Sequence, residues 1–287
     1  MRRLKTSRCV LKSCNTALSN KTLKSLSESY KTYLFYSDTF KFKPLLKDRL
    51  QYFESVFTAA NKKEFYYKLG AKRVIAVPWA CDTEFHKRIE LDKIYNVSFI
   101  GTAYSERKWV INRLEGVKVF GDFWDKKLYI FKDFFGNGKN VFGPVYGEDY
   151  IKVINQTKIN LNIQGKSSVI AVAPTMRTFE VAGCAGFQIS DHLPAMSECF
   201  PFIPTCKSID ELKELIKHYL DSEAKREEIT IKSQERCYKF YKCINGQENQ
   251  LVINLPCPVV STLFLVCKTL PCHILFLYLS RALRHIF

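Results

Sequence analysis

The stretch Thr175–Asp191, TMRTFEVAGCAGFQISD, constrains the fold more than any other part of the chain. Its pattern predicts a short helix that carries Arg177 and Glu180 one turn apart, a glycine-containing turn that begins at Gly183, and a buried strand over 187–190. A helix of this kind beside an apolar strand is typical of open α/β sheets, which bind ligands at the carboxyl ends of their strands. We therefore expect a ligand site here.

The two charged residues of this helix suggest which ligand the site would take. A helix start offers unpaired N–H groups and a partial positive charge, which suit a phosphate or a sugar hydroxyl. Arg177 adds a forked donor for phosphate, and Glu180 adds a pair of acceptors for vicinal hydroxyls. The alternative is an exposed pair at i and i+3 on a surface helix, without any ligand.

A second candidate phosphate site follows the compact strand predicted over 97–100. The residues after it combine a glycine, hydroxyl groups and basic side chains at the opening of a helix, namely Gly101, Thr102, Ser105, Arg107 and Lys108. Neither GxxxxGK[ST] nor GxGxxG occurs, so this is not a P-loop or a dinucleotide fingerprint. A turn of this type also occurs in many proteins without a ligand role.

Strands and helices alternate along most of the chain, which predicts an α/β protein with parallel sheets. Apolar, β-prone runs predict strands over 33–36, 55–58, 74–77, 97–100, 117–120, 159–163 and 187–190. Helical patterns cover 45–53, 62–69, 105–114, 148–156 and 222–241. Gly70 lies where a left-handed residue ends a helix, and Ser208 with Glu211 forms a capping box for a further helix.

We expect four regions along the chain. They are a basic, poorly ordered start (1–30), a partial N-terminal Rossmann-like domain (31–92), a C-terminal Rossmann-like domain (93–242) and an atypical hydrophobic tail (243–287). The polar segment 81–94 is a linker near the domain boundary, and we expect its His86 to be a solvated loop side chain.

Composition limits the classes of protein that this chain can belong to. With 47% hydrophobic and 14% aromatic residues it is globular, and its net charge of +16 attracts anions. The 11 cysteines include no CxxC pair, which favours reduced thiols in a cytoplasmic protein over a metal site. The start has no apolar core of a secretory signal. The tail contains prolines and a lysine, so membrane contact through it is possible but not favoured.

Four segments of the chain, in order, resemble the C-terminal half of CgeB-like spore maturation proteins, which belong to the GT-B glycosyltransferases. These segments are VSFIGTAYSERKWVINRL, VFGPVYGEDYIKVINQTKINLNI, RTFEVAGCAGFQISD and KSIDELKELIKHYL. Earlier, FYSDTF and VFTAANKKEFYYKLGAKRVIAVPWACD resemble the end of the N-terminal domain of that family. The resemblance covers about residues 31–240.

The resemblance implies a GT-B-like α/β fold of two Rossmann-like domains, with the N-terminal one incomplete and a nucleotide-sugar donor held mainly by the C-terminal one. It implies no metal and no other cofactor. Glu180 would hold the donor ribose, Arg177 and the 101–108 turn would hold the diphosphate, and Pro144 and Val145 would pack near the base. The donor-binding candidates are Glu180, Arg177, Gly101, Thr102, Ser105, Arg107, Lys108, Pro144, Val145 and Gly183.

The sequence thus predicts a glycosyltransferase that moves a sugar from a nucleotide-diphosphate donor to an unknown glycan, protein or small-molecule acceptor. Many such enzymes place a second acid eight positions before the ribose-binding one; that position is Val172, so neither retention nor inversion is implied. One alternative is an inactive, truncated relative that binds nucleotide or a partner. A less favoured alternative is a nucleic-acid-binding protein, suggested by the charge and by the aromatic and lysine residues of 123–139.

Overall fold

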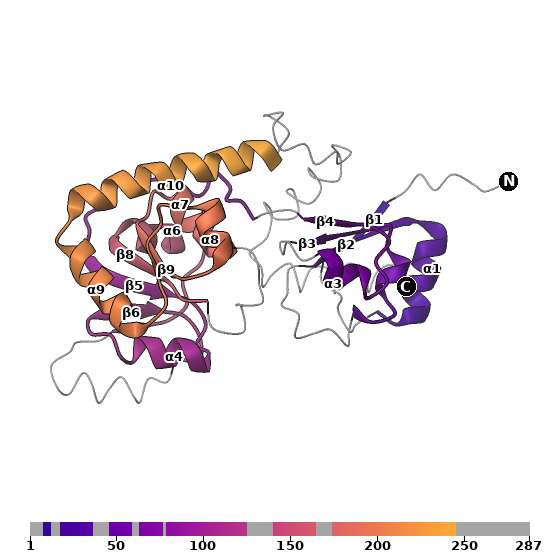
Figure 1. Cartoon of the computed structure of the whole chain (residues 1–287), viewed down its shortest axis with the longest axis horizontal. Coiled ribbons are helices and arrows are strands. Elements are labelled where there is room, and N and C mark those ends of the chain that lie inside the picture. Colours follow the sequence, from indigo (N-terminus) through magenta and orange to yellow (C-terminus); the bar gives the residue numbers. More distant parts are fainter. Residues whose placement is uncertain are drawn as a thin grey trace. The chain divides into compact units, whose positions relative to one another are not determined.

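A computed structural model gives the fold of the chain (Figure 1). It describes residues 8–12, 18–36, 46–58, 63–76, 79–124, 140–164 and 174–244. The chain divides into two compact units, which we describe separately. The first comprises 1–79, 164–175 and 193–199, and the second comprises 80–163, 176–192 and 200–287.

The described part of the first unit contains a four-stranded parallel sheet in the order β1-β2-β3-β4. Its strands are β1 (Arg8–Lys12), β2 (Lys31–Tyr36), β3 (Ser55–Thr58) and β4 (Val74–Ala76). Helix α1 (Asn20–Ser29), the 3₁₀ turn η2 (Leu50–Tyr52) and helix α3 (Lys63–Tyr67) connect them. Leu34, Val56 and Tyr66 are among the side chains of its core.

Two elements of this unit lie in the region that we expected to be poorly ordered. Strand β1 is formed by RCVLK, and helix α1 begins after Ser19, whose hydroxyl accepts a hydrogen bond from the N–H of Thr22 at 3.1 Å. The strand has only five residues beside a basic start, and the ten residues of α1 include just two apolar side chains, Leu23 and Leu26, so neither element shows a clear apolar pattern. The helix expected over 45–53 is, in its described part, mostly a turn that ends in η2, whereas Gly70 adopts the expected left-handed conformation, with φ of 90°.

The described part of the second unit contains a six-stranded parallel sheet in the order β10-β9-β8-β5-β6-β7. Its strands are β5 (Tyr95–Ile100), β6 (Val117–Phe120), β7 (Val141–Phe142), β8 (Thr157–Asn162), β9 (Gln188–Asp191) and β10 (Thr205–Cys206). Strand order reverses on the two sides of β5, so the loops after β5 and β8 lie at the switch point of the sheet.

Helices cover both faces of this sheet (Figure 1). The apolar side chains of α4 (Ser105–Ile111) and α9 (Ile209–Leu220) pack on one face, and those of α6 (Gly147–Asn155) and α7 (Met176–Gly183) pack on the other. The long helix α10 (Glu223–Ile244) packs against α7 and α9. Helix α9 begins as the capping box predicts, because the hydroxyl of Ser208 accepts from the N–H of Glu211 at 3.1 Å.

A row of buried polar side chains joins β8, β9 and α7. The Asn162 amide donates to the Thr178 hydroxyl at 2.8 Å, the Gln188 amide donates to the Thr178 carbonyl at 2.9 Å, and the Asn160 amide donates to the Phe187 carbonyl at 3.1 Å. These bonds satisfy groups that would otherwise be costly to bury. They fix α7, which carries the charged pair, to the two strands beneath it.

Several predictions lie outside the described residues. The aromatic and lysine run is described at Phe123 and Trp124 but not over 125–139, Val172 is not described, and the tail is described no further than Ile244. Within the part of the chain that the structure describes, no helix is long and apolar enough to cross a membrane.

Candidate functional site

The loops that follow β5 (residues 101–104) and β6 (residues 121–124) are hydrogen-bonded to each other, and together we call them the platform. The N–H of Gly101 donates to the Phe120 carbonyl at 2.7 Å, and the Ala103 N–H donates to the Asp122 carbonyl at 3.0 Å. The Trp124 indole N–H donates to the Gly101 carbonyl at 2.8 Å. These bonds lie within the two loops themselves, so the turn after β5 keeps its shape without help from a ligand.

Two arginines converge on this turn. The guanidinium of Arg107 donates to the carbonyls of Ile163 and Thr102, at 2.9 and 3.0 Å. A Cβ atom built on Gly101 would lie 3.2 Å from Nη1 of Arg177 and 3.4 Å from Nη1 of Arg107. The absence of a side chain at Gly101 therefore leaves the room that both guanidinium groups occupy.

The charges at this point are incompletely compensated among the described residues. Burial and then the neighbouring Arg177 lower the pKa of Arg107. The Nε atom of Arg177 is buried and has no hydrogen-bond partner in the described part of the chain, while its guanidinium lies 5.7 Å from the Tyr150 ring centre. Two close cations and a buried N–H donor favour an anion at this position.

Glu180 lies one turn further along α7 and is held by side chains from two other segments. The Tyr150 hydroxyl, from α6, donates to Oε2 of Glu180 at 2.7 Å, and Nε2 of His86 lies 4.0 Å from Oε1. Burial and then the Glu180 charge raise the pKa of Tyr150 well above its ordinary value, so the phenol keeps its proton. Tyr150 contacts Arg177 through its ring and Glu180 through its hydroxyl.

The expectation that His86 is a solvated loop side chain is wrong. Its side chain is 13% exposed, close to the 15% of Glu180, which it faces. A local turn fixes the imidazole, because the N–H of Asp82 donates to Nδ1 of His86 at 3.1 Å and the N–H of His86 donates to the Asp82 carbonyl at 2.7 Å. The polarity of the segment concealed a side chain that packs on α7.

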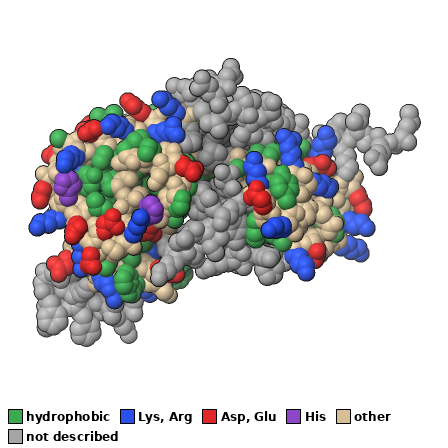
Figure 2. All heavy atoms as spheres, in the orientation of Figure 1, with side chains coloured by type: hydrophobic (Ala, Val, Ile, Leu, Met, Phe, Trp, Pro, Cys, Tyr) green, Lys and Arg blue, Asp and Glu red, His purple; other side chains and the backbone are tan. Residues whose placement is uncertain are grey.

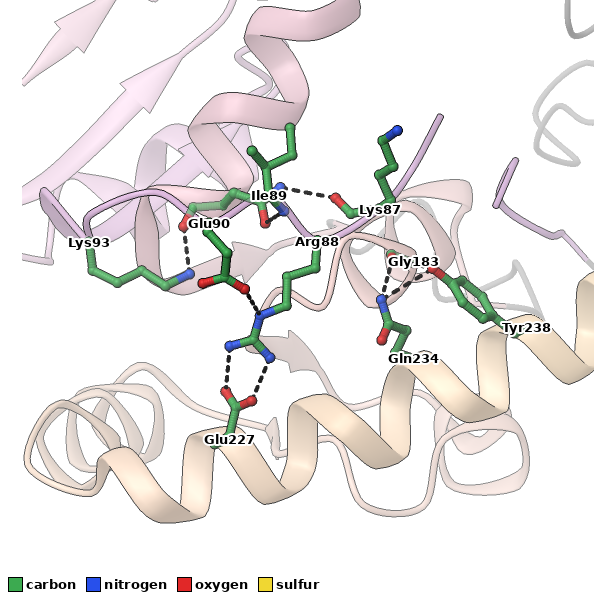
Figure 3. Close-up of polar contacts among 10 residues, drawn as sticks. Lys87, Arg88, Ile89, Glu90, Lys93, Gly183, Glu227, Gln234 and Tyr238 are labelled. Atoms are coloured by element: carbon green, nitrogen blue, oxygen red, sulfur yellow. Dashed lines mark hydrogen bonds and ion pairs between the residues drawn. The ribbon is translucent and has the colours of Figure 1, made fainter. Parts of the chain in front are cut away.

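The linker that carries His86 is part of the second unit, and its residues 87–93 make hydrogen bonds and ion pairs there (Figure 3). Buried Asn155, the last residue of α6, accepts from the N–H of Ile89 at 3.0 Å and donates to the Lys87 carbonyl at 3.3 Å. The Lys93 ammonium donates to the Asn155 carbonyl at 2.6 Å. These bonds hold the segment on either side of Arg88 in one conformation.

The linker also contacts α10 and the end of α7. Arg88 reaches both carboxylate oxygens of Glu227, as Figure 3 shows. A Cβ on Gly183 would lie 2.6 Å from Sγ of Cys81 and 3.2 Å from Cβ of His86. Gly183, a donor-binding candidate, therefore stands where the linker passes α7 at close range.

The remaining candidates differ in how the structure places them. Thr102 belongs to the platform, where its carbonyl accepts from Arg107. Ser105 begins α4 and is exposed, and Lys108 is half-buried on the same helix. Pro144 is exposed after β7, and Val145 packs beside the apolar side chains of α6 and α7. The described contacts bring together Gly101, Thr102, Arg107, Arg177 and Glu180. Gly183 lies beside His86, and Val145 packs on the same apolar cluster as Tyr150.

Sequence reasoning missed Tyr150 and His86. A signal existed for Tyr150, because it is the polar-tipped member of an otherwise aliphatic helix face in GEDYIKVIN. For His86 the sequence gives no such signal. Among the described residues, no group of three or more His, Cys, Asp or Glu side chains is placed to hold a metal ion.

Known proteins resemble this chain in sequence or in fold. A family model described as "Glycosyl transferase-like" matches residues 103–248. A search of curated proteins gives no match. Among solved structures, sucrose-phosphate synthase from Thermosynechococcus elongatus superposes with a TM-score of 0.58 at 11% identity, over 82% of this chain and 69% of that one.

Two further solved structures were determined with a nucleotide sugar. HepE from Anabaena, in complex with UDP-glucose, has a TM-score of 0.56 at 13% identity over 77% of each chain. The DNA-modifying enzyme β-glucosyltransferase, studied with and without uridine diphosphoglucose, has a TM-score of 0.56 at 16% identity, over 82% of this chain and 78% of that one.

These matches establish the fold as GT-B-like α/β, with two parallel sheets in the described residues. The family model matches more than half of the chain and includes α7 with its charged pair. The chain belongs to the glycosyl transferase-like family.

Proposed function

We propose that the chain binds a nucleoside-diphosphate sugar at the loops after β5 and at the start of α7, and transfers the sugar to an acceptor. The convergence of Arg107 and Arg177 on Gly101 carries this proposal. Two guanidinium groups that are close together, one of them with a lowered pKa, are stabilised when a diphosphate lies between them. Within this proposal the chain is a CgeB-like member of its family.

Each side chain has a distinct part in the proposed site. The two arginines bind the diphosphate and stabilise the negative charge that grows on it as the sugar leaves. Glu180 accepts hydrogen bonds from the ribose hydroxyls, since its carboxylate is held in place and is partly exposed. The UDP-glucose complexes of the two solved structures support a uridine nucleotide as the first donor to test.

Calorimetric titration of UDP, GDP and pyrophosphate tests the proposed site. We expect Arg177→Ala to weaken all three by about 10-fold or more, because it removes a charge-assisted contact to the diphosphate. Glu180→Ala should weaken UDP or GDP and leave pyrophosphate unchanged, since pyrophosphate has no ribose. Arg113→Ala and Glu228→Ala are matched controls, because both side chains are exposed and lie on other parts of the unit.

Unchanged nucleotide affinity in both site variants would refute the assignment. Measurement of sugar release from UDP-glucose then separates an active transferase from a relative that binds without turnover. A nucleic-acid-binding role is the weaker alternative. On the face that Figure 2 shows, Lys and Arg side chains are interspersed with Asp and Glu over the described residues, without a continuous basic surface.

A further inference from the structure

The gap between His86 and Glu180 has a size that suits one shared ligand atom. Nε2 of His86 and Oε1 of Glu180 are 4.0 Å apart, which is too long for a direct hydrogen bond. A hydroxyl oxygen can nevertheless lie about 2.8 Å from both atoms at once, in the normal range for a hydrogen bond. Such a hydroxyl would donate to the carboxylate and accept from the imidazole.

The chemistry of the two side chains fits this arrangement. Nδ1 of His86 lies 3.1 Å from both the backbone nitrogen and the carbonyl oxygen of Asp82. In the tautomer in which Nδ1 accepts from the Asp82 N–H, the imidazole carries its proton on Nε2, which faces Glu180. The Tyr150 hydroxyl occupies Oε2 of Glu180 at 2.7 Å and leaves Oε1 for another donor. In this tautomer the site presents one donor, at Nε2 of His86, and one acceptor, at Oε1 of Glu180, which is what a single hydroxyl requires.

The position of the pair is fixed before any ligand arrives. His86 is held by the Asp82 turn and lies against Gly183, where a Cβ would come within 3.2 Å of it. Asn155 anchors the following residues of the linker to α6. The two side chains remain 13% and 15% exposed, so a ligand hydroxyl can reach them from solvent.

We propose that His86 is a further donor-binding residue, which with Glu180 brackets one ribose hydroxyl of the nucleotide. This inference rests on the proposed function, because it takes Glu180 as the ribose-binding residue. It assigns to the linker a direct part in ligand recognition. It also predicts selectivity for ribonucleotides over the deoxynucleotide that lacks the bracketed hydroxyl.

A thermodynamic cycle that combines substitution of His86 with removal of one ribose hydroxyl from the ligand tests this assignment. UDP, 2′-deoxy-UDP and 3′-deoxy-UDP, with the GDP series in parallel, are titrated into the wild type, His86→Phe and His86→Gln. Phenylalanine keeps a ring of similar shape without the N–H, whereas glutamine restores a donor. We expect His86→Phe to weaken ribonucleotide binding about 5-fold, the value of one hydrogen bond, and His86→Gln to recover part of that loss.

The decisive result is the behaviour of the deoxynucleotides. For one of the two, the loss caused by His86→Phe should disappear, because the hydroxyl that His86 contacts is already absent. An equal loss for all three ligands, or none for any, would overturn the inference, since His86 would then act on the fold alone or not at all. Thermal midpoints of the variants, with His218→Phe on α9 as the control, show whether each protein is folded.

Failure of the proposed function gives a different outcome. In that case neither UDP nor GDP binds the wild-type chain, or Glu180→Ala leaves their affinity unchanged. Either result refutes both the proposed donor site and the proposed role of His86. If instead Glu180→Ala weakens the nucleotide while the cycle at His86 shows no dependence on either hydroxyl, the donor site stands and His86 has no part in it.

Discussion

Nη1 of Arg177 lies 3.2 Å from the point where a Cβ atom would be on Gly101. The turn after β5 and the first turn of α7 thus meet at a distance that a single methyl group would fill. The glycine is needed there for the space it leaves to the arginine, and not for the tightness of the turn alone. This relation makes several predictions about single-residue changes.

Gly101→Ala should weaken binding of UDP or GDP by about 10-fold. The added methyl lies within 3.4 Å of the guanidinium groups of Arg177 and Arg107 and of the Phe99 ring, so the arginines have to move. Calorimetric titration measures the effect. Gly116→Ala is the matched control, because its φ is also positive, at 70°, and its Cβ would have no neighbour within 4 Å. Equal affinity in the two variants would contradict the prediction.

Gly121→Ala should destabilise the protein by more than about 3 kcal/mol. Its Cβ would lie 2.1 Å from the carbonyl oxygen of Gly101, a backbone atom that also accepts from the Trp124 indole. The Gly101 carbonyl is a backbone group, so it cannot move away without breaking the hydrogen bonds that join the loops after β5 and β6. Urea unfolding measures the free energy, with Gly116→Ala again as the control for a glycine of positive φ. A change below about 1 kcal/mol would show that the loops separate more readily than their hydrogen bonds indicate.

Asn155→Ala should cost about 2 kcal/mol of unfolding free energy, because it removes a buried side chain that makes two part-buried hydrogen bonds to the linker backbone, each contributing about 1 kcal/mol. Arg88→Ala removes an ion pair with Glu227 whose side chains are both 45% exposed. We expect it to cost less than about 1 kcal/mol, and less still at high salt. Chemical denaturation of both variants gives the comparison, and a larger loss for Arg88→Ala would reverse this ranking.

Stability should fall in alkaline solution partly because of Cys206. Burial, and then the charges of Asp191 and Glu211, raise the pKa of this thiol to about 12. The unfolded thiol ionises near its ordinary pKa of about 8.5. The contribution of Cys206 is therefore fully present below pH 8.5 and is lost as the pH rises towards 12, by about 1.4 kcal/mol per pH unit.

Unfolding free energies measured between pH 8.5 and 10.5 test this sign. The slope for Cys206→Ala should be shallower than that of the wild type, since the other groups that titrate in this range are unchanged. Identical slopes would mean that the folded thiol ionises as readily as the unfolded one.

The sequence predicts the α/β class and the helix that carries Arg177 and Glu180, because these follow from local periodicity and from short motifs. It also locates the Ser208 cap and the left-handed glycine, Gly70, that follows α3. These features depend on residues a few positions apart, so pattern reasoning can find them. Strand β1 was not predicted, because the basic residues around it are typical of a solvated terminus.

The contacts of the candidate site are harder to predict. His86 and Glu180 lie on segments far apart in the sequence, and no spacing rule connects a linker histidine with a helix carboxylate. Tyr150 has two roles that depend on its orientation, which helical periodicity does not define. The lowered pKa of Arg107 likewise follows from a burial and a neighbour that tertiary packing alone creates.

The row of amides at Asn160, Asn162 and Gln188 has a consequence for how the sheet assembles. A slip of one residue between β8 and β9 would turn these amides towards the apolar layer and leave them without acceptors, at a cost of several kcal/mol. Misaligned pairings are thereby rejected during folding. Thr178 of α7 belongs to the same row of hydrogen bonds. The alignment of β8 with β9 therefore also determines the positions of Arg177 and Glu180, which lie on α7.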